Sequence, residues 1–206
     1  MQQGKTKSRR LILQTGTLIT LSLSLPSIAR AGAQREETLA DDVASIMRNA
    51  VDNASPPRLV FDNITDGQRW LSNMSTRLRS FVPDAYGRTR LLTNIHYEAM
   101  RAGLDPQVIL GLIEVESRFR QYAISNVGAR GLMQVMPFWV KQIGRPEHNL
   151  FDIRTNLRYG CTILRYYRNR ENGNMERALA RYNGSLGRTT YSNAVISAWQ
   201  KHWQWA

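Results

Sequence analysis

Apolar side chains recur every three to four residues along most of the chain, a spacing that places them on one face of an α-helix. The first such run contains Leu39, Val43, Ile46, Met47 and Ala50, and acidic residues crowd its first turns, where the helix dipole favours them. Strand-like alternation of apolar and polar positions is nearly absent. The pattern therefore predicts a mainly α fold.

Start and stop signals divide the rest of the chain into further helices. Thr65 or Asp66 can cap a helix whose apolar face runs from Trp70 to Phe81 and which Pro83 ends. Asp105 followed by Pro106 is a cap with proline in the first turn, which opens another helix. Further helices are expected over 85–101, with Leu91, Leu92, Ile95 and Met100 facing inward and Gly103 as the stop, and over about 156–170, 176–181 and 192–203.

Residues 1–31 have the three parts of a secretory signal peptide: a basic start, an apolar stretch from Leu11 to Leu25, and a small-x-small site at 29–31. The apolar stretch is shorter than a bilayer span and is interrupted by polar residues, so no stable membrane span is expected after cleavage. Arg9 and Arg10 leave both the Sec and the twin-arginine (Tat) route open. The sequence predicts an exported, periplasmic protein.

The net positive charge of the chain limits the kinds of partner that it can bind. The net charge of +12 includes five basic residues of the signal peptide, so the remainder keeps 23 basic against 16 acidic residues, a net charge of +7. An exported basic chain meets the carboxylates of peptidoglycan and anionic lipid, and no nucleic acid partner is therefore predicted.

Cysteine and histidine usage indicates neither a disulfide framework nor a metal site. Cys161 is alone and follows the apolar spacing of its helix, which predicts a buried thiol. His96, His148 and His202 are scattered without metal-ligand spacing. No metal and no cofactor are predicted.

Two glutamates lie two positions apart in the helix that begins at Pro106. Glu116 follows Ile109, Leu112 and Ile113 by seven, four and three residues, so it lies within the apolar stripe, whereas Glu114 lies on another face. We expect Glu114 to be solvated and paired with Arg118 at i+4. Desolvation raises the pKa of a carboxyl group, which suits a general acid. A buried glutamate paired with Arg120 is the structural alternative for Glu116.

The residues around Glu116 resemble the catalytic region of family 1 lytic transglycosylases, the soluble lytic transglycosylase domain. Three ordered blocks carry the resemblance, and together they cover about residues 85–198. They are Glu116-Ser117 with Ser125 and the unbroken run Gly128-Ala129-Arg130-Gly131-Leu132-Met133-Gln134-Val135-Met136-Pro137; Asn156-Leu157-Arg158-Tyr159-Gly160; and Arg181-Tyr182-Asn183-Gly184-Ser185 with Tyr191 and Val195. The third block departs from the family, which usually has Ala-Gly where this chain has Gly184-Ser185.

The resemblance implies a lysozyme-like helical domain of the goose type over 81–206, with an N-terminal helical extension over 32–80. Of that extension, the part before Pro57 is expected to be a loosely docked arm. Glu116 would be the catalytic acid, while the substrate contacts would come from Ser125, Gln134, Met136, Tyr182, Asn183 and Tyr191. A tyrosine such as Tyr182 can equally be a satisfied core residue.

The implied activity is cleavage of the β-1,4 bond between N-acetylmuramic acid and N-acetylglucosamine of peptidoglycan glycan strands, leaving a 1,6-anhydro-muramoyl end. Two alternatives stay open: a goose-type-lysozyme-like hydrolase, with Asp152, Glu147 or Glu176 activating water, and a noncatalytic peptidoglycan-binding or assembly module. A partner in an envelope complex is not identified by the sequence. Trp199 and Trp203 at i, i+4 predict that the C-terminal tail packs back on the domain.

Overall fold

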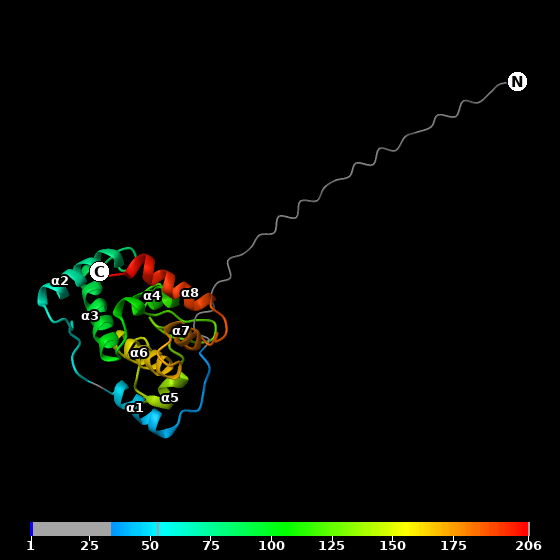
Figure 1. The fold of residues 1–206 in the computed structure, drawn as a ribbon, viewed down its shortest axis with the longest axis horizontal. Coiled ribbons are helices and arrows are strands. Elements are labelled where there is room, and N and C mark those ends of the chain that lie inside the picture. The colour runs from blue at the N-terminus through cyan, green and yellow to red at the C-terminus, as the bar shows by residue number, and fades with distance from the viewer. Residues whose placement is uncertain (2–33, 53, 206) are drawn as a thin grey trace.

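The fold was analysed in a computed structural model that describes residues 1, 34–52 and 54–205 (Figure 1). The predicted signal peptide thus lies outside the described residues, apart from Met1. No strand occurs in the described ranges, which confirms the mainly α fold class. The helices are α1 (Asp41–Val51), α2 (Ile64–Leu78), α3 (Ala85–Arg101), α4 (Pro106–Ser117), α5 (Phe138–Ile143), α6 (Ile153–Arg170), α7 (Met175–Asn183) and α8 (Thr190–Ala198), followed by a π-helical turn over Trp199–Trp203.

Helix α4 lies at the centre of the molecule and packs against α8, the π-helical turn and α3, while α6 packs against α1, α3 and α7. Gly111 permits a close approach of α4 to α8 and the π-helical turn, because a Cβ at this position would lie 2.9 Å from the backbone nitrogen of Trp199 and 3.0 Å from the carbonyl oxygen of Val195. α1 and α5 lie at one end of the molecule, and α2 and the C-terminus lie at the other (Figure 1). None of the helices described is long and apolar enough to cross a bilayer.

Several helix boundaries differ from the sequence prediction because an earlier side chain provides the cap. Asn63, rather than Thr65 or Asp66, caps α2, with its Oδ1 accepting a hydrogen bond from Thr65 N at 2.8 Å. Asp152 caps α6 and starts it at Ile153. Helix α5 was not predicted, since six residues are too few to show a periodicity.

Two apolar residues predicted to face inward are exposed. Ile46 keeps 69% of its surface and Met100 keeps 42%. α1 instead buries Ala44, Met47 and Val51, which repeat at three and four. The consecutive residues Ile46 and Met47 leave the helix about 100° apart. The packing of α1 on α6 buries Met47 and leaves Ile46 in solvent.

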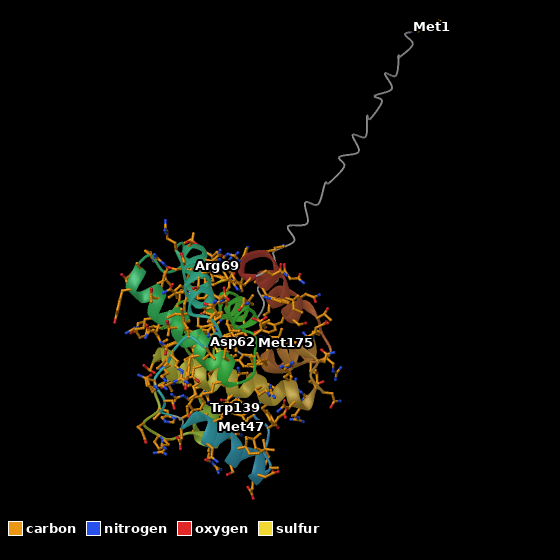
Figure 2. The ribbon with its side chains drawn as sticks, turned by 60° about the vertical axis from the view of Figure 1, so that its left-hand side comes forward. Met1, Met47, Asp62, Arg69, Trp139 and Met175 are labelled. Carbon is orange, nitrogen blue, oxygen red and sulfur yellow. The ribbon has the colours of Figure 1, made fainter. Side chains whose placement is uncertain are left out.

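The region before Pro57 was expected to be loosely docked, and the structure differs for α1. Met47 of α1 belongs to the hydrophobic core, and Figure 2 shows it at the same end of the molecule as Trp139 of α5. Arg158 of α6 donates to the carbonyl oxygen of Val51 at 2.8 Å. Apolar burial and a charged hydrogen bond therefore both hold α1 on α6.

A buried carboxylate joins α3 to α6. The side chain of Glu98 has no exposed surface and pairs with Arg101 at 2.8 Å, with Arg158 at 3.4 Å and with Arg154 at 3.5 Å. The sequence pattern gave no indication of this cluster. Three guanidinium groups compensate the charge of one buried carboxylate, so its removal should be costly.

The predictions for the C-terminal tail and for Cys161 are confirmed. Trp203 has no exposed surface and its ring lies 5.4 Å from that of Phe119. Cys161 is fully buried, and burial raises the pKa of its thiol. The tail thus completes the core beside α4.

Glu114 has a different partner from the one predicted. It accepts hydrogen bonds from Trp203 Nε1 at 2.7 Å and from His202 Nδ1 at 2.9 Å. α4 ends at Ser117, so Arg118 has left the helix with φ of 52° and its guanidinium lies 5.9 Å from the ring centre of Phe81. Glu114 therefore fixes the tail.

Candidate active site

Glu116 projects from the last turn of α4 and is only 5% exposed. Its Oε1 accepts a hydrogen bond from the Tyr191 hydroxyl of α8 at 2.5 Å, while Oε2 is buried and has no hydrogen-bond partner in the described part of the chain. Arg120 does not pair with it: its Nε donates to the carbonyl oxygen of Ser117 at 3.0 Å. The structural alternative, a buried Glu116–Arg120 pair, is absent.

Burial raises the pKa of Glu116 to about 8, and the hydrogen bond from Tyr191 only partly opposes this. The charged form is disfavoured because the apolar side chains of α4 and its neighbours cannot replace lost water. At neutral pH the carboxyl group is therefore protonated. A protonated carboxyl group with one unpaired oxygen can donate a proton, and it can take one back later.

The chain turns sharply after Glu116 and returns as a loop. Arg118 and Phe119 both have positive φ, at 52° and 61°, which reverses the chain directly after α4. Isolated antiparallel bridges join Ile124 to Arg130 and Arg130 to Val135. The signature residues 128–137 thus form a folded loop beside the end of α4.

Ser125 shapes this loop. Its Oγ accepts hydrogen bonds from Val127 N at 3.3 Å and from Ala129 N at 3.1 Å, the pattern of a serine turn. The side chain is half-buried. The structure therefore shows a turn-forming role for Ser125, and its expected contact with substrate remains a proposal.

Gln134 is buried within the same loop. Its φ is 49°, and its side-chain Nε2 donates to the carbonyl oxygens of Gly131 at 2.9 Å and Ala123 at 3.2 Å. Gly131 has φ of 75°, and a Cβ there would lie 2.5 Å from the carbonyl oxygen of Leu150. The side-chain amide nitrogen of Gln134 therefore donates its hydrogen bonds to backbone carbonyl groups of the loop.

The Asn-x-x-x-Gly block anchors the loop to α6. Asn156 Oδ1 accepts from Met133 N at 2.8 Å, and its Nδ2 donates to the carbonyl oxygens of Arg130 and Leu150, both at 2.8 Å. A Cβ on Gly160 would lie 2.3 Å from the sulfur of Met133. The asparagine and the glycine together let the loop rest directly on α6.

The third block supplies a core residue rather than an exposed ring. Tyr182 has no exposed surface, and its hydroxyl donates to the carbonyl oxygen of Met133 at 2.7 Å. The expected contact between its ring and a sugar is therefore corrected: Tyr182 supports the loop. Asn183 is 6% exposed at the end of α7, and Met136 is half-buried against the core.

None of the three carboxylates that a hydrolase could use to activate water is placed beside Glu116 by a described contact. Asp152 caps α6, accepting from Thr155 N at 2.8 Å. Glu147 and Glu176 are exposed. Within the described ranges Tyr191 is the side chain that hydrogen-bonds to Glu116. No three His, Cys, Asp or Glu side chains there are grouped to hold a metal ion.

Gln34 is the site residue that sequence reasoning missed. Its side chain is 5% exposed, and its Oε1 accepts from Met136 N at 3.2 Å and from Trp139 Nε1 at 3.0 Å. A single glutamine in a coil carries no periodicity and belongs to none of the blocks. No sequence signal could have placed it against the loop.

Comparison with known proteins gives a consistent family. The family model described as Transglycosylase SLT domain matches residues 93–201. The transglycosylase of Enterobacteria phage PRD1 is 34% identical over 88 residues, 43% of this chain and 32% of that protein. Membrane-bound lytic murein transglycosylase C of Yersinia pestis is 32% identical over 114 residues, 48% of this chain and 32% of that protein. The same-named protein of Mannheimia succiniciproducens is 37% identical over 84 residues, 36% of this chain and 24% of that protein.

A structural search adds the X-ray structure of an inactive mutant of lytic transglycosylase Slt from Pseudomonas aeruginosa. It is 27% identical in sequence and superposes with a TM-score of 0.42 over 53% of this chain and 22% of that chain. The chain thus spans about a third or less of the length of these relatives.

Proposed function

Because the chain belongs to the transglycosylase SLT domain family, we propose that it is a peptidoglycan lytic transglycosylase. It cleaves the β-1,4 bond between N-acetylmuramic acid and N-acetylglucosamine and leaves 1,6-anhydro-muramoyl ends. The names of the relatives from Yersinia and Mannheimia, membrane-bound lytic murein transglycosylase C, support murein as the substrate. The observation that carries the proposal is the buried Glu116, whose pKa burial raises to about 8.

A single carboxyl group of this kind suffices for the reaction. Glu116 first donates its proton to the glycosidic oxygen as the bond to the anomeric carbon of N-acetylmuramic acid breaks. The same carboxylate then takes the proton of the C6 hydroxyl, whose oxygen bonds to the anomeric carbon and closes the anhydro ring. No water is consumed, and Glu116 ends protonated as it began. A group that acts as acid and then as base works best with a pKa near the working pH.

The site residues divide by position in this proposal. Glu116 is the catalytic residue, and the Tyr191 hydroxyl positions it at 2.5 Å. The residues proposed to contact the glycan are Ser125, Gln134, Met136, Asn183 and Tyr191. Gln134 also shapes the loop through its amide donors. We retain 81–206 as the catalytic domain and 32–80 as the helical extension of an exported, periplasmic protein.

The products of digestion test this proposal against the hydrolase. We expect purified sacculi digested in 18O-water to release muropeptides that end in unlabelled 1,6-anhydro-muramic acid, detected by mass spectrometry. These ends should resist borohydride reduction, because no water enters the cleaved bond. Labelled, reducible ends would identify a hydrolase instead, and Asp152 would be the first carboxylate to replace. Retained binding to sacculi without any release would favour the noncatalytic module.

Replacing Tyr191 with phenylalanine should move the pH dependence of cleavage. The tyrosine hydroxyl stabilises the charged form of Glu116, so its removal raises the pKa of Glu116 above about 8. Activity of an acid catalyst declines as pH rises through its pKa. The alkaline limb of the pH–rate profile should therefore shift to higher pH, while the rate at neutral pH falls about tenfold with the loss of a ~1.5 kcal/mol hydrogen bond.

Tyr182→Phe is the matched control, because its hydroxyl bonds to the backbone of Met133 and not to Glu116. It should leave the alkaline limb where it is in the unmodified protein. A limb that moves equally in both variants would show that loop packing, rather than the hydrogen bond to Glu116, sets the pKa.

A further inference from the structure

The segment before α1 crosses the loop that carries the signature residues. We call residues 34–40 the strap. Its backbone makes no hydrogen bond to other backbone groups in the described chain until Ala40 O accepts from Ala44 N at 2.9 Å at the start of α1. In the part of the chain that the structure describes, each remaining hydrogen bond or ion pair of the strap involves at least one side chain. Segments with few backbone hydrogen bonds open at low free-energy cost.

Gln34 is the inner anchor of the strap. Its carboxamide oxygen accepts from Met136 N at 3.2 Å and from Trp139 Nε1 at 3.0 Å. Its carboxamide nitrogen donates to the carbonyl oxygen of Gln134 at 3.5 Å. The loop and α5 together thus present two donors and one acceptor to a single amide group. Gln34 as a whole is 5% exposed.

The outer anchor is ionic. The Glu37 carboxylate pairs with Arg170 of α6 and with Arg181 of α7, the latter at 3.6 Å, and Gln142 Nε2 donates to the Glu37 carbonyl oxygen at 3.1 Å. The side chains of Glu37 and Arg170 keep 32% and 41% of their surface exposed. Ion pairs with this exposure weaken as salt is added.

The amide site lies on the signature loop that follows the proposed catalytic group. Gln34 bonds to backbone groups of Gln134 and Met136 in this loop. The Tyr182 hydroxyl supports the same stretch from α7 by donating to the carbonyl oxygen of Met133 at 2.7 Å. A ligand group in the place of the Gln34 carboxamide would therefore contact the signature loop directly.

We propose that Met136 N–H, Trp139 Nε1–H and the Gln134 carbonyl form a binding site for an acetamido group of the glycan, and that Gln34 occupies it in the free protein. A 2-acetamido sugar offers the same chemistry as a glutamine side chain: a carbonyl oxygen that accepts and an N–H that donates. The choice of glycan as the ligand rests on the proposed function. The strap is then a self-occluding segment that glycan displaces.

Replacement of the Gln34 carboxamide by an acetamido group costs less free energy than release of the strap without a replacement. Gln34 is the hydrogen-bond partner that the described residues give to Met136 N and to Trp139 Nε1. A buried donor left without a partner costs about 1–3 kcal/mol. An entering acetamido carbonyl would satisfy both donors, so displacement of Gln34 leaves no buried group unpaired.

Binding of tri-N-acetylchitotriose, measured by calorimetry, tests the proposal without requiring cleavage. Gln34→Ala should tighten binding about tenfold, because the trisaccharide no longer competes with an internal ligand worth ~1.4 kcal/mol. Glu37→Gln loosens the outer anchor and should tighten binding about threefold. Glu36→Gln is the matched control, since the neighbouring Glu36 is exposed and should leave the affinity unchanged. Added salt should tighten binding to the unmodified protein and have less effect on Glu37→Gln.

Two further ligands test whether the site binds the acetamido group of a sugar or the amide of a peptide. The deacetylated glucosamine trimer should gain nothing from Gln34→Ala, and free stem peptide, which carries amides without sugar, should not compete with the trisaccharide. Equal gains for both trimers, or competition by the peptide, would overturn the acetamido assignment.

Weaker or unchanged trisaccharide binding in Gln34→Ala would overturn the occlusion and show that the strap completes the site. Glu37→Gln carries the test if Gln34→Ala does not fold. If the binding results are as expected but sacculi yield no anhydro products, the occlusion by Gln34 is supported and the proposed transglycosylase reaction is contradicted.

Discussion

Replacing Glu116 with glutamine should lower the rate of sacculus cleavage by about 10²–10⁴-fold, the usual contribution of a general acid–base group. Glutamine has nearly the shape of a protonated glutamate and can still accept the hydrogen bond from Tyr191, but it cannot transfer a proton. Release of anhydro-muropeptides over time, at equal protein concentration, measures the loss. Binding of glycan should survive, because no substrate-contacting group other than the acid has changed.

The same substitution should stabilise the fold above neutral pH. The pKa of Glu116 is raised from 4.5 to about 8, so between these values the unfolded chain releases a proton that the folded protein retains. The stability contributed by the protonated carboxyl is fully present below pH 4.5 and is lost as pH rises toward 8. At pH 7 this loss is on the order of 3 kcal/mol. Glu116→Gln should therefore unfold at higher temperature than the unmodified protein at pH 8, with little difference at pH 4.

Glu114→Gln provides the matched control on the same helix. It changes the partner of His202 and Trp203, which are part of the tail and not of the site. We expect near-normal cleavage, and a lower melting temperature from the weakened tail contacts. Equal loss of activity in the two variants, or loss in Glu114→Gln alone, would contradict the assignment of Glu116 as the acid.

Replacing Glu98 with alanine should produce the largest loss of stability, about 3–5 kcal/mol. The Glu98 side chain has no exposed surface, and its removal leaves the guanidinium groups of Arg101 and Arg158 partly buried without a counter-charge. The midpoint of urea unfolding, monitored by circular dichroism, measures the effect. Because Arg158 also holds the end of α1 through the Val51 carbonyl, proteolysis of the segment before α2 should accelerate.

Asp66→Ala is the matched control for this prediction. Asp66 and Arg69 form an ion pair with the same i, i+3 spacing as Glu98 and Arg101, but their side chains are 52% and 68% exposed. Solvent screens such a pair, so the free energy of unfolding should change by less than about 1 kcal/mol. A similar loss in both variants would show that burial does not distinguish the two acids.

Much of the fold was predictable because local rules act within a few residues. Asp105 and Pro106 begin α4 as predicted, since cap and first-turn preferences depend on neighbouring backbone groups alone. α3 likewise spans Ala85–Arg101 as predicted. The burial of Glu116 also followed from spacing, because its apolar stripe needs only one helix to be defined.

The sequence by itself thus determined most of the helices, the face of α4 that is buried and the glutamate that this face carries. Only the tertiary structure decided which side chains meet: Tyr191 with Glu116, Asn156 with the loop, Gln34 with Met136, and His202 with Glu114. These pairs are separated by 23 to 102 residues along the chain. Periodicity specifies the direction of a side chain from its own helix axis, whereas a contact between helices depends on their mutual packing, which the summed burial of the whole core selects.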